Sequence, residues 1–231
     1  MLSGEEWGIV ALSLKVSGVA IFCALPVAFA FAWLLARGRF AGKVLVDALV
    51  HLPLVLPPVV VGWMLLIAFA PSGPLGAPLA RYLGITLLFR WTGAALAAAI
   101  MALPLMVRAI RLSLEAIDPR LEAAARTLGA GRWDSFATIT LPLARPGVLA
   151  ALVLGFARSL GEFGATITFV SNVPGETETL PLAIYAKLQV PGAESAVWRL
   201  ALVSVALSLC ALVMSEWLVR RGAQGRETHV L

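Results

Sequence analysis

A polar, alanine-rich segment near the middle of the chain decides the fold class: residues 118–142 read DPRLEAAARTLGAGRWDSFATITLP. Asp118 followed by Pro119 is typical of a helix start, because aspartate caps free N–H groups and proline fits the first helical position. The run Leu121–Leu128 consists mainly of good helix formers. Gly129 is the residue type that commonly stands just past a helix end. The segment therefore predicts a short helix followed by a tight turn.

A second short helix is expected over about 133–140. Pro142 and Pro146 follow it, and proline lacks the backbone N–H that a helix interior needs, so we expect this helix to end before the next apolar run. Residues 115–142 should therefore form a helical hairpin. Its alanine side chains give it a smooth face that suits a groove on another protein.

Long apolar runs flank this hairpin on both sides. Of the 231 residues, 60% are hydrophobic and 13% are charged, whereas a soluble domain is about 45–50% apolar and about 25% charged. This excess argues against a soluble enzyme, because one core of this chain length cannot bury it. A helix needs about 20 residues to cross a bilayer, and five runs reach that length: 9–36, 44–70, 91–113, 146–170 and 196–219.

The sequence therefore predicts an all-α polytopic membrane protein, with about five transmembrane helices and a single domain over residues 1–231. Two of the runs are not expected to be plain helices. Pro53, Pro57 and Pro58 lie in the second run, where we expect a kink or a late start. For the fourth run two outcomes stay open: a helix that continues through residue 170, or one that ends near Gly161 with a re-entrant piece after it.

The basic residues favour one orientation, because cytoplasmic loops carry an excess of Lys and Arg. Four basic residues (Arg81, Arg90, Lys187 and Arg199) lie on the side away from the hairpin. We therefore expect the N-terminus outside, and the hairpin and C-terminus in the cytoplasm. The basic residues occupy short loops rather than one patch, so no nucleic-acid partner is expected. Twelve lie on the hairpin side: Arg37, Arg39, Lys43, Arg108, Arg111, Arg120, Arg126, Arg132, Arg145, Arg220, Arg221 and Arg226.

The stretch RSLGEFGATIT at 158–168 places charge inside the fourth apolar run. A helix entering at Pro146 would carry Arg158 about 18 Å along its axis, near the bilayer centre, where a charge usually faces a pathway or a partner. Glu162 lies four residues further on the same helix face and can neutralise Arg158.

We identify this stretch as the candidate translocation path or gate. Glycines allow close helix approach or local unwinding, and hydroxyl groups can bind an oxyanion without trapping it. A second interpretation stays open, in which the ion pair pins adjacent helices and the glycines serve packing. The candidate residues are Arg158, Ser159, Gly161, Glu162, Gly164, Thr166 and Thr168.

The 118–142 segment resembles the Glu-Ala-Ala loop of ABC importer permeases, through Ala124-Ala125-x-x-x-Gly129 and Ile139-Thr-Leu141-Pro142. In that family the loop docks into a cleft on the ATPase subunit. The family's acid directly precedes the alanine pair, whereas here the acid stands one place earlier, so a solvated helix-start acid is an alternative to a docking contact. The resemblance assigns these residues to ATPase coupling: Glu122, Ala124, Ala125, Gly129, Ile139, Leu141 and Pro142.

A narrower resemblance follows from GEFGATITFVSN at 161–172 and PGETETLPLAIY at 174–185. Both are similar to the permease subunit of molybdate ABC transporters, and sulfate permeases carry a looser version. The resemblance implies a homodimer in the bacterial inner membrane, two ATPase subunits and an extracytoplasmic molybdate-binding protein. It also implies import of molybdate, with tungstate as a second candidate, by alternating access.

The chain itself is not expected to be an enzyme. It lacks the phosphate loop Gly-x-x-x-x-Gly-Lys-[Ser/Thr] and any pattern of nucleophile with base, or of metal ligands. We therefore predict no catalytic residue, no metal site and no cofactor on this chain, with ATP and Mg²⁺ on the partner ATPase. Two alternatives stay open: a sulfate or thiosulfate ABC permease, and an ion-driven secondary anion carrier.

Overall fold

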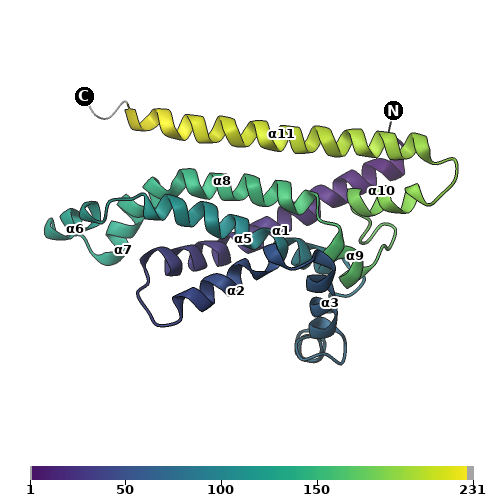
Figure 1. Cartoon of the computed structure of the whole chain (residues 1–231), viewed down its shortest axis with the longest axis horizontal. Helices are drawn as coiled ribbons and strands as arrows, with labels where there is room; N and C mark the ends of the chain where they lie inside the picture. Colours follow the sequence, from purple (N-terminus) through teal and green to yellow (C-terminus); the bar gives the residue numbers. More distant parts are fainter. Residues whose placement is uncertain (1, 228–231) are drawn as a thin grey trace.

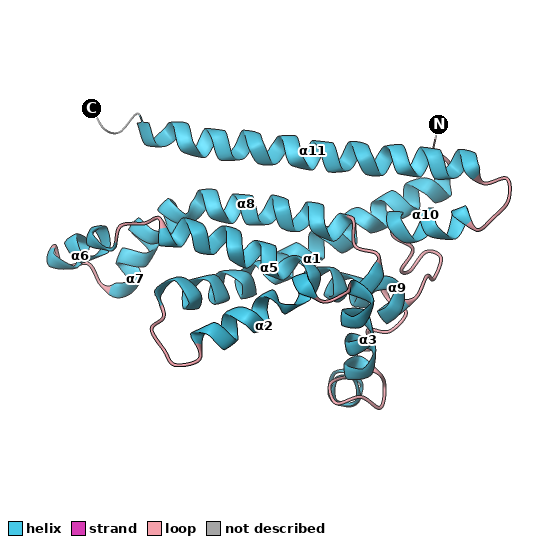
Figure 2. Cartoon of the chain, in the orientation of Figure 1, coloured by secondary structure: helices cyan, strands magenta, loops and turns pink. Residues whose placement is uncertain are grey.

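The computed structural model describes residues 2–227, with side chains described for residues 2–214. These residues form helices joined by short loops, and the described chain contains no strand (Figure 2). The predicted all-α class is therefore confirmed. Arg220, Arg221 and Arg226, which entered the orientation argument, lie outside the described side chains.

The helical elements differ widely in length. The longest are α1 and α11, while η1 and η2 are single π-helical turns. In chain order the elements are α1 (Gly4–Arg37), α2 (Lys43–Val55), α3 (Pro58–Phe69), α4 (Gly76–Pro78), η1 (Leu79–Leu83), α5 (Trp91–Glu115), α6 (Pro119–Thr127), α7 (Arg132–Ser135), η2 (Phe136–Thr140), α8 (Leu141–Leu160), α9 (Gly164–Val170), α10 (Leu180–Leu188) and α11 (Glu194–Glu227).

Four helical stretches in the described chain are long and apolar enough to cross a membrane: α1, α5, the run Arg132–Leu160, and α11 over Glu194–Met214. The bent pair of α2 and α3 makes a fifth if it counts as one span. The long helices run along the long axis of the molecule, with α6 and α7 at one end and α10 at the other (Figure 1). We call these two ends the hairpin end and the far end.

The predicted kink in the run 44–70 is a sharp break. α2 ends at Val55 and α3 begins at Pro58, and the two helix axes are bent by 111°. Leu56 is extended, with ψ 143°, because a proline pushes the residue before it out of the helical region. Neither Pro57 nor Pro58 can donate a backbone hydrogen bond across the break. As a result, α3 leaves the long axis and projects from the bundle (Figure 1).

The prediction that the second hairpin helix ends near Thr140 is wrong. α7, η2 and α8 form one helical run from Arg132 to Leu160. The π-helical turn η2 comes directly before Pro142, and its wider hydrogen-bond spacing accommodates a proline ring that would crowd an ordinary α-helical turn. Pro146 is accommodated inside α8. The hairpin and the apolar fourth run are therefore joined by continuous helix.

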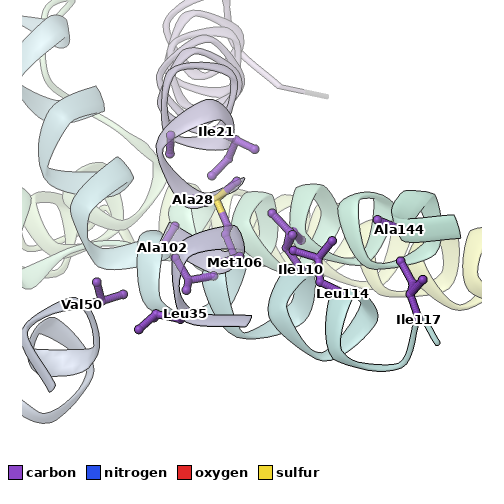
Figure 3. Packing of buried hydrophobic residues seen from close by; sticks show 14 residues of the cluster. Ile21, Ala28, Leu35, Val50, Ala102, Met106, Ile110, Leu114, Ile117 and Ala144 are labelled. Atoms are coloured by element: carbon purple, nitrogen blue, oxygen red, sulfur yellow. The ribbon is translucent and has the colours of Figure 1, made fainter. Parts of the chain in front are cut away.

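Small side chains let α1, α5 and α8 pack closely around the main core (Figure 3). A Cβ atom at Gly155 of α8 would lie 2.8 Å from the Met106 side chain of α5 and 3.0 Å from Ile21 of α1. Buried alanines and larger residues such as Leu35 and Ile110 fill the rest of this core. The contact at Gly155 also places this part of α8 at the level of the middle of α1, because Ile21 lies there.

Polar contacts at the far end join the start of α1 to α10 and α11. Ser3 caps α1 by accepting the Glu6 N–H at 3.2 Å, and the Glu6 carboxylate accepts the Ser3 N–H at 2.7 Å. Arg199 of α11 donates to Glu6 from Nε at 3.0 Å and from Nη2 at 2.8 Å. Ser13 accepts the N–H of Leu180, the first residue of α10, at 2.7 Å. These bonds fix how the last two helices sit against the first.

Candidate functional site

The first half of the hairpin folds by local rules. The Asp118 carboxylate accepts the Arg120 N–H at 2.9 Å and caps α6. At the other end Gly129 has φ +94°, a left-handed conformation that glycine adopts at little cost. The Ala130 N–H then donates to the Ala125 carbonyl at 3.0 Å, closing the helix end with a Schellman bond. The predicted start and stop of this helix are both confirmed.

The Glu122 carboxylate turns inward from α6 onto two other elements. Its Oε1 accepts from Arg37 Nη2 at the end of α1, at 2.9 Å, and from Thr140 Oγ1 of η2, at 2.8 Å. The Glu122 side chain is 16% exposed and that of Arg37 is 22% exposed, so the pair is partly shielded from solvent. The solvated acid considered from the sequence does not describe this carboxylate. Its contact with an ATPase stays a prediction.

An aromatic cluster reinforces the same junction. Phe29 and Trp33 stack along α1 with ring centroids 6.4 Å apart. Phe136 of η2 meets Trp33 edge-on at 5.1 Å and Phe29 at 6.0 Å, and Trp133 meets Phe136 edge-on at 6.0 Å. Edge-to-face aromatic pairs prefer this range of distances. The hairpin is thus held on the end of α1 by one polar contact group and one aromatic group.

Large apolar side chains stand exposed on the outer surface of the hairpin. Leu128 is 89% exposed and Trp133 is 83% exposed, on either side of the turn at Gly129. The predicted coupling residue Ala124 is also exposed, whereas Ile139 is half-buried. Exposed apolar groups gathered in this way mark an interaction surface. The sequence interpretation missed Leu128 and Trp133, although their position beside the glycine turn was a usable signal.

The fourth run breaks where the re-entrant outcome placed it. α8 ends at Leu160 and α9 begins at Gly164. Glu162 lies in this break with 3% of its surface exposed. Its Oε2 pairs with Arg158 Nη1 at 2.7 Å, and its Oε1 accepts the Ala165 N–H at 2.8 Å. The ion pair expected from the sequence is therefore present, and the same carboxylate also starts the next helix.

Glycines bring α3 against α9 at this break. A Cβ atom at Gly62 of α3 would lie 2.5 Å from the Ala165 carbonyl oxygen, and one at Gly164 would lie 2.8 Å from Pro58 Cβ. Neither position has room for a side chain. Gly161, in contrast, has its nearest neighbour at 3.9 Å and is exposed. The projecting helix α3 and the short helix α9 therefore form a packed unit beside the ion pair.

The predicted hydroxyl donors differ in what they contact. Thr168 Oγ1 donates to the Gly164 carbonyl of its own helix at 2.9 Å. Ser159, the residue that follows Arg158, is buried, and its Oγ has no partner in the described chain. Thr166 is buried at 2% exposure. All seven candidate residues thus lie around one break, but the Thr168 hydroxyl is already engaged.

The break lies near the middle of the bundle. Arg158 is three residues beyond Gly155, which contacts Ile21 at the middle of α1. Arg158 therefore lies about 5 Å from the middle of α1, on the side of the far end. From Arg132 to Arg158 the helical run covers about 39 Å. One continuous helix thus connects the exposed hairpin to an ion pair deep in the apolar part of the chain.

Comparisons with known proteins agree with this arrangement. Residues 24–223 match a family described as "Binding-protein-dependent transport system inner membrane component". The chain is 59% identical over 220 residues to the "Molybdenum transport system permease protein ModB" of Escherichia coli (strain K12), covering 95% of this chain and 96% of that protein. It is 43% identical over 158 residues to the "Sulfate transport system permease protein CysT" of the same strain, covering 68% of this chain and 57% of that protein.

A solved structure shares the arrangement of helices. A chain of a bacterial ABC transporter involved in the import of the acidic polysaccharide alginate has a TM-score of 0.71 to this chain. The two are 19% identical, and the match covers 96% of this chain and 80% of that chain. At this identity the likeness concerns the fold alone, and it confirms that the helices are arranged as in ABC importer permeases.

Proposed function

The chain belongs to the family of binding-protein-dependent transport system inner membrane components, and we propose that it is the permease subunit through which an ATP-driven importer moves molybdate. The observation that supports the cargo is 59% identity, over 95% of the chain, to a molybdenum permease. As a permease subunit it carries out no chemistry on the cargo, and hydrolysis of ATP with its Mg²⁺ falls to a separate ATPase subunit.

The continuous helix Arg132–Leu160 supports a mechanical role for the hairpin. In our proposal, the ATPase contacts the exposed Leu128 and Trp133 side chains, and its closure moves the hairpin together with α8. Because α8 ends at the Arg158–Glu162 pair, the movement reaches the break beside α3 and α9. Two arrangements of the break, each favoured by a different nucleotide state, would give alternating access.

The ion pair has a composition that suits passage of an oxyanion. Arg158 attracts a dianion, while Glu162 reduces the net charge and keeps the cation from trapping the cargo. The buried hydroxyl of Ser159, the next residue after Arg158, is a neutral donor without a partner in the described chain. We assign Arg158, Ser159 and Glu162 to the gate, with Gly62 and Gly164 as the close contact that lets α3 and α9 move as one unit.

The assembly that we propose contains two copies of this chain, two ATPase subunits and an extracytoplasmic binding protein. α3 projects from the bundle (Figure 1), and Trp63, Met64 and Ile67 on it are each about half exposed. A second copy would cover this apolar surface, as lipid covers the outer helix faces. We place the hairpin in the cytoplasm and the N-terminus outside, following the excess of basic residues on the hairpin side.

Reconstitution tests this proposal. We would purify the permease with its ATPase and binding protein, insert the complex into proteoliposomes, and measure molybdate uptake with ATP and with a non-hydrolysable analogue. The expected result is uptake that requires hydrolysis and is blocked by tungstate but not by excess sulfate. Equal competition by sulfate would identify a sulfate permease. Uptake that proceeds without the ATPase would identify an ion-driven carrier.

A further inference from the structure

A charged groove lies between α2 and α5, towards the hairpin end of the bundle. Its volume is about 320 Å³, and its position is separate from the break that ends α8. α2 supplies an aspartate and a histidine one helical turn apart, and α5 supplies two arginines and a glutamate along one face. The lining residues are Asp47, His51, Arg108, Arg111, Leu112 and Glu115.

Hydrogen bonds between these groups fix the groove. Arg111 donates from Nη1 to Asp47 Oδ1 at 3.0 Å, joining α5 to α2, and from Nε to Glu115 Oε1 at 2.8 Å. His51 Nδ1 lies 2.9 Å from the Asp47 carbonyl oxygen and 3.2 Å from Asp47 Oδ1. Both neighbours of this nitrogen are acceptors, so Nδ1 carries a proton and the ring is held at a set angle.

Several strong donors remain unused after these bonds are counted. Arg108 is exposed and has no hydrogen-bond or ion-pair partner in the described chain. A guanidinium has five N–H groups, and the two bonds of Arg111 leave about three of them free. His51 Nε2 is also without a partner in the described residues. The groove therefore presents two arginine forks, one wholly free and one held in place.

Water or another polar group, and not the hydrocarbon of lipid tails, must lie against this groove. Arg108 is seven residues before the end of α5, about 10 Å inside the helix, and a charge at that depth faces a cavity or a partner. The rest of the exposed α2 surface is apolar, including Val44 at 83% and Val55 at 82% exposure. Beyond its first residue, Lys43, the described α2 carries charged groups at one place only, and there they interrupt an apolar surface.

We propose that this groove binds a tetrahedral oxyanion, with Arg108 as the main donor and the free edge of Arg111 as the second. The inference rests on the proposed function: the ligand is the cargo after it has passed the Arg158–Glu162 gate. Gly155 of α8 and Met106 of α5 lie at the same level, because they are in contact. Arg108 is two residues from this level towards the hairpin end, and Arg158 is three residues from it towards the far end. Arg108 therefore lies about 8 Å nearer the hairpin end than Arg158. A planar guanidinium fork matches two oxygen atoms of such an anion.

The two carboxylates explain why the site would release its ligand. Asp47 and Glu115 offset the charges of Arg108 and Arg111, so that, with His51 not counted, the groove carries a formal net charge of zero. A dianion is then attracted by Arg108 but repelled by the two acids at slightly longer range. Binding is therefore weak, as a site on the exit side of a pathway requires. A phospholipid headgroup carries the same phosphate chemistry and is the other source of an oxyanion at this depth.

The experiment measures tungstate binding to the assembled permease–ATPase complex in nanodiscs of pure phosphatidylcholine, by equilibrium dialysis. Arg108→Gln should weaken this binding by about tenfold or more, because a charge-assisted contact is lost, while Arg108→Lys should weaken it less. Arg39→Gln is the matched control, since Arg39 is an exposed arginine at the same end, has no ion-pair partner among the described residues, and lies outside the groove. Thermal unfolding of each complex checks that the variants are folded.

A second arm uses nanodiscs that contain equal amounts of phosphatidylcholine and phosphatidylglycerol, with retained lipid measured by native mass spectrometry. Retention of phosphatidylglycerol that depends on Arg108, without tungstate binding in either lipid, would overturn the proposal and identify a headgroup site. Tungstate binding that is equal in wild type and Arg108→Gln would also overturn it. If the wild-type complex imports no molybdate, the proposed function itself fails, and the two failures are thereby distinguished.

Discussion

Two of the glutamates that pair with an arginine lie in contrasting regions, one in the hairpin and one at the break between α8 and α9. Glu122 accepts from Arg37 and Thr140, which come from elements far apart in the sequence. Glu162 accepts only from its own neighbourhood, from Arg158 four residues before it and from a backbone N–H three residues after it. The same chemistry therefore fixes tertiary placement in one region and a local turn in the other.

Burial separates the two pairs further. The Glu122 side chain is 16% exposed, whereas that of Glu162 is 2% exposed. Removing one partner of a buried ion pair leaves an uncompensated charge and is more costly than removing one from a partly solvated pair. A change at the break should therefore lower stability more, whereas a change at the hairpin should act mainly on the transmission of movement.

The largest effect is expected for Glu162→Ala. The change leaves Arg158 without its counter-charge and the N–H of Ala165, in the first turn of α9, without its acceptor, at a cost of about 3 kcal/mol. We expect a clear fall in the melting temperature of the purified complex and loss of molybdate uptake. Glu162→Gln keeps an acceptor for the N–H and should recover part of the stability. A smaller loss of stability in Glu162→Ala than in Glu122→Ala would contradict the expected difference between the two ion pairs.

Glu122→Ala should cost only about 1 kcal/mol, because the pair that it removes is partly solvated. Its main effect should be on coupling: with the polar contact between the hairpin and α1 removed and only the aromatic contact left, molybdate imported per ATP hydrolysed should fall by about fivefold or more. The measurement is uptake and phosphate release in the same proteoliposomes. Arg37→Glu combined with Glu122→Arg exchanges the two charges of the pair and should restore part of the ratio of molybdate imported to ATP hydrolysed. An unchanged ratio in Glu122→Ala would show that the contact is not needed for coupling.

Two glycines offer a smaller and well-matched test. Gly129→Ala in the hairpin forces a side chain into a backbone with φ +94° and should cost about 1 kcal/mol. Gly161→Ala at the break should change stability by less than about 0.5 kcal/mol, because φ is −91° and no atom lies closer than 3.9 Å. Chemical unfolding of both variants measures the difference. Equal losses of stability in the two variants would mean that the left-handed conformation at Gly129 does not contribute the expected strain.

The features that could be predicted from the sequence are those set by neighbouring residues. Asp118 and Gly129 act through bonds to residues one to four places away, so their pattern identifies the first hairpin helix without tertiary information. The Arg158–Glu162 pair is of the same kind, since four residues separate its members. Hydropathy likewise predicts the long helices, because each must be apolar along its own length.

The features that the sequence could not predict depend on residues that meet only after folding. Arg37 and Glu122 are 85 positions apart, and neither has a local pattern that points to the other. The proline rule also failed at Pro142, because the π-helical turn before it relieves the steric conflict that the rule assumes. The direction of α3 depends on where Gly62 meets α9, which follows from packing and not from periodicity.

The smallest effect is expected for Thr168→Val, and its outcome separates the two interpretations of the break. The Thr168 hydroxyl donates to the Gly164 carbonyl of its own helix, so valine of similar shape should change stability by less than about 0.5 kcal/mol and uptake by less than about twofold. Ser159→Ala is the matched comparison, because that hydroxyl is buried without a partner in the described chain. If Ser159→Ala lowers uptake while its stability stays normal, the free hydroxyl meets the cargo and the break is part of the path. If both variants transport normally, neither hydroxyl is needed for transport, and the interpretation in which these residues serve packing is favoured.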